Sequence, residues 1–363
     1  MKKNTNHSNV TTYNNTEKQN KTKPVNRKSN KGLAFTGILL AIFLVIGIGI
    51  AIYANSLLGL IKEPEFTGDP SIQESDVAEP EQTVDAPDSS KEIEQAVIDV
   101  DEVKKIPIPE DKNVYNILLI GTDRRTGETN GRSDSMIILS INKKTEQISL
   151  VSLMRGLYVD IPGRGFGMLN ASYSYGGPKL LLQTIEDNLR VKIDDYIAID
   201  FSGFTKAIDV VGGVNISLSK AEVNYLEARY PNAGLKAGSN RLNGDISLAY
   251  ARIRKLDNDF KRTGRQREVI EALIKKMTSL NVGQLDGAVR QLLPLVKTNK
   301  TGASFISLGM DALKARNYPI SQMMLPIDGT HKMIIVRKMQ MEQFDVEKNV
   351  QALHEKLYGI NKK

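Results

Sequence analysis

Five arginines lie within one short stretch of the sequence, YARIRKLDNDFKRTGRQR (250–267). They are Arg252, Arg254, Arg262, Arg265 and Arg267. Like charges this close repel one another unless an anion or water takes them up. Guanidinium groups match phosphate oxygens, and each charge-assisted hydrogen bond is worth roughly 1.5–3 kcal/mol. The stretch therefore indicates a bound anion, such as a nucleic acid, an acidic protein surface or a small phosphate. A solvated basic face is the alternative.

The spacing within this stretch predicts that several of its side chains share one region. If residues 251–254 are extended, Arg252 and Arg254 point to the same side, because strand side chains alternate. If a helix starts near Arg262, then Arg265 and Gln266 follow at i+3 and i+4 on the same face. Four guanidinium groups and one amide would then converge.

Two further groups of residues stand where predicted strands end. The loop GTDRRTGETNGRSDS (121–135) holds Asp123, Arg132 and Asp134 between two apolar runs. Two carboxylates at adjacent strand ends can face one point, and their hard oxygens suit Mg²⁺ that also grips phosphate oxygens. Arg155 directly follows a third apolar run, LVSLM. A solvated hairpin loop and a structural salt bridge remain the alternatives.

The amino-acid composition excludes some kinds of catalytic and metal site. The 363 residues contain no cysteine and only three scattered histidines, which rules out thiol chemistry and makes a histidine relay or metal cluster improbable. The net charge of +7 is unevenly spread, with eight basic residues and one acidic residue in 1–32. Five basic and sixteen acidic residues follow in 62–112, so the basic excess returns after residue 112, where it can act on a ligand.

The sequence predicts a single membrane anchor with the working domain outside. Residues 33–61 carry no charge, and 33–54 include enough apolar residues to span a bilayer as a helix. A cleaved signal peptide is the alternative. Basic residues precede this segment and acidic residues follow it, which predicts a cytoplasmic tail (1–32), an acidic extracellular stalk (55–112) and an extracellular domain (113–363). An arginine cluster outside the cell does not meet the chromosome, so we expect no nucleic acid partner.

The domain itself is predicted to be α/β, with a mixed central sheet flanked by helices. Short apolar runs at 114–121, 135–142, 147–153 and 196–201 read as strands, and 135–153 reads as a hairpin. Helices are predicted after the glycine pair at 176–177, over 202–211, from 243, over about 263–280, and near the C-terminus.

These motifs resemble the LytR-CpsA-Psr family of Gram-positive cell-envelope proteins. The resemblance rests on the ordered segments NILLIGTDRR, GRSDSMIILSIN, VSLMRGLYVDIPGRG, LNASYSYGGPKLLLQTIEDNL and RLNGDISLAYARIRKLDNDFKRTGRQR, which span 116–267. It implies a transferase that moves a glycopolymer phosphate, of the teichoic acid or capsule type, from a polyprenyl-pyrophosphate carrier to peptidoglycan. It also implies that the polyprenyl tail lies in an apolar tunnel between sheet and helices, walled by 203–211 and 117–120.

The resemblance implies a role for each site residue. Asp123 and Asp134 would hold Mg²⁺, and with Arg155 they would form the catalytic group. The pyrophosphate would be bound by Arg132, Arg252, Arg254, Asp259, Arg262, Arg265 and Gln266. Two positions depart from the family pattern, because Gly156 replaces a common aspartate and Met168 a common lysine. These departures leave a second hypothesis open, a non-catalytic binder of polyprenyl phosphates or envelope polymers.

Overall fold

The computed structural model describes residues 55–56, 59–60, 100–123, 132–300 and 303–360. Its centre is a six-stranded sheet in the order β10-β3-β2-β1-β6-β9. β1 (Val114–Thr122), β2 (Ser133–Asn142) and β3 (Gln147–Leu153) form an antiparallel meander. β6 (Asp195–Asp200) and β10 (Ile320–Leu325) join it in parallel, and β9 (Val296–Thr298) is antiparallel to β6. The predicted mixed α/β fold is therefore confirmed.

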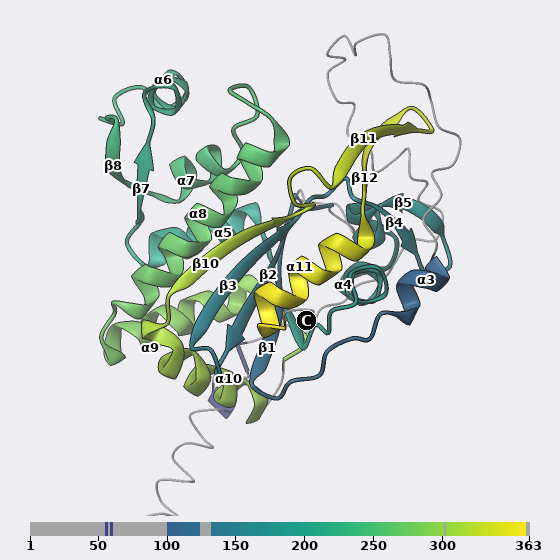
Figure 1. The fold of residues 1–363 in the computed structure, drawn as a ribbon. Coiled ribbons are helices and arrows are strands. Elements are labelled where there is room, and N and C mark those ends of the chain that lie inside the picture. The colour runs from purple at the N-terminus through teal and green to yellow at the C-terminus, as the bar shows by residue number, and fades with distance from the viewer. Residues whose placement is uncertain (1–54, 57–58, 61–99, 124–131, 301–302, 361–363) are drawn as a thin grey trace, which may run out of the picture. The chain divides into compact units, whose positions relative to one another are not determined.

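Both faces of this sheet are covered by helices (Figure 1). On one face Leu118 and Ile138 belong to a core with Leu181 of α4 (Leu169–Leu189) and Leu353 of α11 (Val346–Tyr358). Side chains alternate along a strand, so Leu119, Ile137 and Leu139 belong to the other face. That face looks toward α5 (Phe201–Val210), α7 (Gly244–Ala251) and α8 (Asp259–Thr278). Because both faces are buried, the central strands are apolar throughout rather than alternating.

The remaining elements extend this framework. The further helices are α3 (Val100–Lys105), α6 (Lys220–Arg229), α9 (Val282–Leu292), α10 (Ala303–Lys314) and the short 3-10 turns η1 (Leu293–Leu295) and η2 (Ala315–Asn317). The further strands pair two by two: β4 (Tyr158–Ile161) with β5 (Gly165–Met168), β7 (Val214–Leu218) with β8 (Gly238–Leu242), and β11 (His331–Val336) with β12 (Met339–Phe344).

Several local predictions need correction. The helix expected after the glycine pair begins earlier, because residues 169–175 are already helical and α4 is kinked at Gly176 and Gly177. Gly177 has φ 62°, a conformation that side chains disfavour, which explains why glycine stands there. α8 begins at Asp259 rather than near residue 263, because Asn258 caps it by accepting a hydrogen bond from the Lys261 amide.

The predicted domain boundary falls inside ordered structure. Helix α3 lies N-terminal to residue 113, and its Val103 is buried. The guanidinium of Arg190, directly after α4, donates to the carbonyl of Ile106 at 2.8 Å. Residues from Val100 onward thus contact the domain. The predicted cytoplasmic tail, anchor and most of the stalk lie outside the described residues, and no helix within the described ranges is long and apolar enough to cross a membrane.

Candidate functional site

A long cavity lies between the sheet and the helices that cover its second face. Its volume is about 1050 Å³, and its walls are mostly aliphatic side chains. β1 contributes Leu119 and Ile120, and α5 contributes Phe204 and Ala207, so both predicted wall elements line it. α9 and η1 close it further along with Val289, Leu292 and Leu293.

The cavity runs along the whole of α8. The lining residues Arg262, Gln266, Ile270, Leu273, Ile274 and Met277 recur at helical spacing on one face of that helix. From Arg262 to Met277 this face is about 22 Å long at 1.5 Å per residue. Along β2 the lining runs from Asp134 to Ile141, about 24 Å at 3.4 Å per residue. The two elements line one channel that is apolar for most of its length. Its polar end holds Asp134 and Arg262, and Arg316 lies near the opposite end, next to Ala315.

Arg262 is the most deeply buried cation at the polar end. Its side chain is 4% exposed, and its Nη2 donates to Asp259 Oδ2 at 2.8 Å. Nε and Nη1 are buried without a hydrogen-bond partner among the described residues. Burial lowers the pKa of Arg262 to about 10, and the neighbouring charges of Arg155 and Arg254 act in the same direction. Arg262 is therefore charged at neutral pH, with donors left to bind an anion.

Asp259 and Arg155 extend this cluster toward β2. Arg155 Nε lies 3.6 Å from Asp259 Oδ2, and Arg155 Nη1 lies 3.8 Å from Asp134 Oδ1. Arg155 is held directly after β3, where its carbonyl accepts a hydrogen bond from the Asn170 amide at 3.2 Å. The structure thus brings together Asp134 of β2, Arg155 after β3, and Asp259 and Arg262 of α8, from three separate segments.

Arg252 and Arg254 reach the same cavity by a different route from the predicted one. Residues 251–254 are not extended: α7 continues to Ala251, and Arg252 is its C-cap with φ −106° and ψ 5°. Both arginines are exposed, and both line the cavity. The Arg252 guanidinium lies 4.4 Å from the ring centroid of Phe201, a cation–π contact that the sequence analysis missed.

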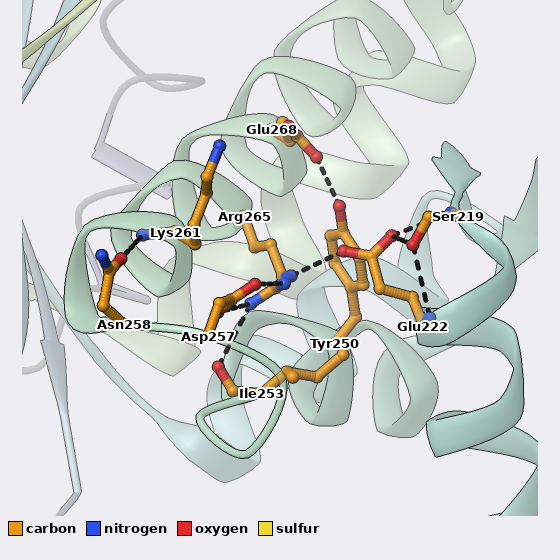
Figure 2. Close-up of polar contacts among 9 residues, drawn as sticks. All are labelled: Ser219, Glu222, Tyr250, Ile253, Asp257, Asn258, Lys261, Arg265 and Glu268. Atoms are coloured by element: carbon orange, nitrogen blue, oxygen red, sulfur yellow. Dashed lines mark hydrogen bonds and ion pairs between the residues drawn. The ribbon is translucent and has the colours of Figure 1, made fainter.

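Arg265 lies apart from this cluster, although the sequence analysis put it with the pyrophosphate-binding residues. Its side chain is 7% exposed and does not line the cavity. Figure 2 shows it between two carboxylates: Nε donates to Glu222 Oε1 at 2.7 Å, and Nη1 donates to Asp257 Oδ1 at 3.1 Å and to the Ile253 carbonyl at 3.2 Å. Protein acceptors thus use most of the Arg265 donors, and Arg265 is a structural residue beside the candidate site rather than part of it.

Asp123 and Asp134 stand at neighbouring strand ends, as predicted. Thr122 of β1 pairs with Ser133 of β2, and the two aspartates follow these residues. Asp123 already accepts from the Arg132 amide at 2.7 Å and from Arg132 Nη2 at 3.3 Å. Within the described ranges no group of three or more metal-ligating acids or histidines occurs. Two carboxylates are nonetheless compatible with Mg²⁺ shared with phosphate oxygens, because Mg²⁺ commonly keeps waters and substrate oxygens as ligands.

Gly156 and Met168, the two positions that depart from the family pattern, have different surroundings. A Cβ on Gly156 would meet only the Gln340 carbonyl, at 3.9 Å, so a larger side chain has space there. Met168 ends β5 and packs against the main core.

This arrangement defines a class of protein: an α/β domain with a cluster of arginines at one end of an apolar channel. The model of the LytR_cpsA_psr family matches residues 81–355. The chain belongs to this LytR-CpsA-Psr family, as its motifs predicted.

The chain is similar in sequence and in structure to several named proteins. The chain is 33% identical over 265 residues to the polyisoprenyl-teichoic acid–peptidoglycan teichoic acid transferase TagU of Oceanobacillus iheyensis, covering 71% of this chain and 73% of that protein. It is also 33% identical over 252 residues to biofilm regulatory protein A of Streptococcus mutans, covering 63% and 61%. Among solved structures, TagT with bound octaprenyl pyrophosphate lipid superposes with a TM-score of 0.54 at 24% identity, over 69% of this chain and 92% of that one. This structural likeness establishes the fold.

Proposed function

We propose that the chain is a membrane-anchored extracellular phosphotransferase that attaches an anionic glycopolymer from a polyprenyl-pyrophosphate carrier to peptidoglycan. The observation that carries this proposal is Arg262, a buried cation with unused donors at the point where the apolar channel begins. A ligand that fits both features has a long apolar tail and a charged phosphate headgroup. The teichoic acid transferase name of the O. iheyensis relative and the lipid bound by TagT support the same ligand class.

In the proposed reaction a peptidoglycan hydroxyl attacks the phosphorus nearer the glycan. A new phosphate ester bond forms, the bond between that phosphorus and the bridging oxygen breaks, and polyprenyl phosphate leaves. Arg155, Arg254 and Arg262 neutralise charge that develops on the phosphate oxygens, and Arg252 and Gln266 position the headgroup. Asp123 and Asp134 are the candidates to accept the hydroxyl proton. When bound at these two carboxylates, Mg²⁺ would supply further charge neutralisation.

Transfer by the full chain in lipid vesicles tests this proposal. Lipid-linked teichoic acid and peptidoglycan are supplied, and covalently attached polymer is measured with Mg²⁺ and after its removal by a chelator. We expect attachment that depends on Mg²⁺. No attachment under conditions where the O. iheyensis relative works would overturn the enzymatic proposal.

A second candidate function is a non-catalytic binder of the same lipid. Gly156 favours it, since the resemblance puts an aspartate at this position, beside Arg155. Gly156 has space for a side chain, whereas Met168 packs against the main core, so folding of the Gly156→Asp, Met168→Lys variant is checked by denaturant unfolding before attachment is measured. Attachment that appears only in this variant, while both proteins copurify with polyprenyl lipid, would identify the natural chain as a binder. Equal attachment by both would exclude that role.

A further inference from the structure

The hairpin of β11 and β12 carries one of the three histidines, His331, in a fixed orientation. His331 Nδ1 lies 2.9 Å from Glu342 Oε2, and both side chains are mostly buried. A carboxylate only accepts hydrogen bonds, so Nδ1 is the donor of this pair. The base of the hairpin is held to α11, because Asn349 Nδ2 donates to Thr330 Oγ1 at 2.8 Å and Asn349 is fully buried. The imidazole ring therefore stands on a firm support.

The His331 ring packs against the first turn of α8. It stacks on the ring of Phe260, with 5.0 Å between the ring centroids and 30° between the ring planes. Phe260 directly follows Asp259, the acid of the arginine cluster. Paired aromatic rings stabilise their arrangement beyond what the burial of their area gives. His331 thus restrains, through Phe260, the backbone that carries Asp259.

Glu342 also holds the chain that follows Arg155. Its amide donates to the Gly156 carbonyl at 2.8 Å, and it forms a β-bridge with Leu157. Gly156 is the residue directly after Arg155. One residue of the hairpin therefore binds the Arg155 segment with its backbone and orients His331 with its side chain.

These contacts bear on the site because Arg155 and Asp259 come from different segments and do not touch closely. Arg155 Nε lies 3.6 Å from Asp259 Oδ2, which is longer than a direct hydrogen bond. Asp259 Oδ2 also accepts from Arg262 Nη2 at 2.8 Å. A shift of either segment would change how Asp259 is shared between the two arginines. The hairpin contacts both segments and so fixes their separation.

We propose that His331, held by Glu342 and stacked on Phe260, is a positioning residue for the transfer reaction that keeps Arg155 aligned with the first turn of α8. The inference rests on the proposed function, in which the arginine cluster neutralises charge on the phosphate oxygens. Electrostatic stabilisation of this kind needs donors that are already in place when the charge develops. Loss of the stack should therefore lower the rate of transfer more than the binding of the lipid.

Steady-state transfer by the full chain in lipid vesicles tests the inference. We expect His331→Ala to lower kcat about tenfold, because a small misplacement of a charged group slows the chemical step. The KM for the lipid-linked donor and the affinity for farnesyl diphosphate should change less than about twofold, since the apolar channel and Arg262 are untouched. His331→Phe keeps a stacked ring, and its kcat should stay within about threefold of the natural chain.

Two further variants test whether the effect passes through the stack. Phe260→Ala should show the same loss as His331→Ala, and the double variant should lose no more than either, because the two rings act as one unit. His354→Ala is the matched control. His354 Nε2 donates to the Arg190 carbonyl at 2.7 Å and the His354 ring packs edge-on against Tyr358, neither of which belongs to the cluster. Its kcat should stay unchanged even where denaturant unfolding shows lost stability.

Amide hydrogen exchange of the natural chain and of His331→Ala adds a readout that does not depend on transfer. Exchange should be faster in the variant for the peptides that contain Glu342 and the first turn of α8. An unchanged kcat in His331→Ala, an equal loss in His331→Phe, or additive losses in the double variant overturns the inference. Absence of transfer by the natural chain would instead count against the proposed function, and unchanged exchange in His331→Ala would still overturn the positioning role.

Discussion

Arg262 and Arg265 stand three residues apart on one helix, and both are buried, yet their surroundings are opposite. Arg265 is enclosed by Glu222 and Asp257, which neutralise it and use its donors. Arg262 has Asp259 as its hydrogen-bonded acid, but Asp259 also faces Arg155. Two nitrogens of Arg262 are left without a hydrogen-bond partner among the described residues.

The difference shows what separates a structural arginine from a binding one. Burying a charge is costly unless it is paired and hydrogen-bonded. Around Arg265 the carboxylates of the protein offset that cost. Their hydrogen bonds also connect α6, and the loop that contains Arg254, to α8 (Figure 2). Around Arg262 the cost remains until a ligand supplies the acceptors. Arg265 should therefore matter mainly for stability, and Arg262 mainly for binding and transfer.

The largest effect is expected from Arg265→Met. Removing one partner of a buried network leaves Glu222 and Asp257 without their cation, which should lower the free energy of unfolding by about 3 kcal/mol. Denaturant unfolding measures this change. Arg267→Met is the control, since Arg267 is a neighbouring arginine that bonds Gln322 rather than a carboxylate. An equal loss of unfolding free energy in both variants would mean that the carboxylates around Arg265 do not add to its effect on stability.

Arg262→Met should show the reverse pattern. We expect transfer and diphosphate binding to fall about a hundredfold, because a preorganised donor to the phosphate oxygens is lost. Stability should stay the same or rise by about 1 kcal/mol, since an incompletely paired buried charge is removed and Asp259 keeps Arg155 nearby. Transfer assays and denaturant unfolding on the same preparations measure both effects. A variant that loses stability as Arg265→Met does would remove the distinction between the two arginines.

The strands and helices of the domain could be predicted from the sequence better than the partners of the individual arginines. The meander, the crossover strand at 195–200 and the final helix follow from apolar runs and their spacing, which are local signals. Arg265 was misplaced because its partner Glu222 lies 43 residues away, on a helix that the sequence analysis did not predict. Arg252 and Arg254 reach the cavity although residues 251–254 are not extended, which was the condition under which their spacing indicated a shared side. Tertiary contacts, not spacing along the chain, decide which acid neutralises which arginine.

The smallest expected effect is a pH-dependent change in the free energy of unfolding that comes from the Arg265 network. It tests whether the charges around Arg265 differ from those around Arg262. Burial would raise the pKa of Glu222, but hydrogen bonds from Arg265 and Ser219 outweigh it and hold the pKa below its ordinary value of 4.5. A carboxyl with a lowered pKa in the folded state stabilises the fold above its unfolded pKa, and this stabilisation is lost as the pH falls through the folded value.

Glu222→Gln should therefore unfold about 1 kcal/mol more easily than the natural chain at pH 7, and this difference should shrink as the pH falls below about 4.5. Thermal or denaturant unfolding from pH 7 to pH 3 measures it, with Asp328→Asn as the control for an exposed carboxylate outside the network. A difference that persists unchanged to pH 3 would mean that Glu222 acts through its shape and neutral hydrogen bonds. Asp257 would then be the one carboxylate that neutralises Arg265 in this network, and the contrast with Arg262 would rest on that ion pair alone.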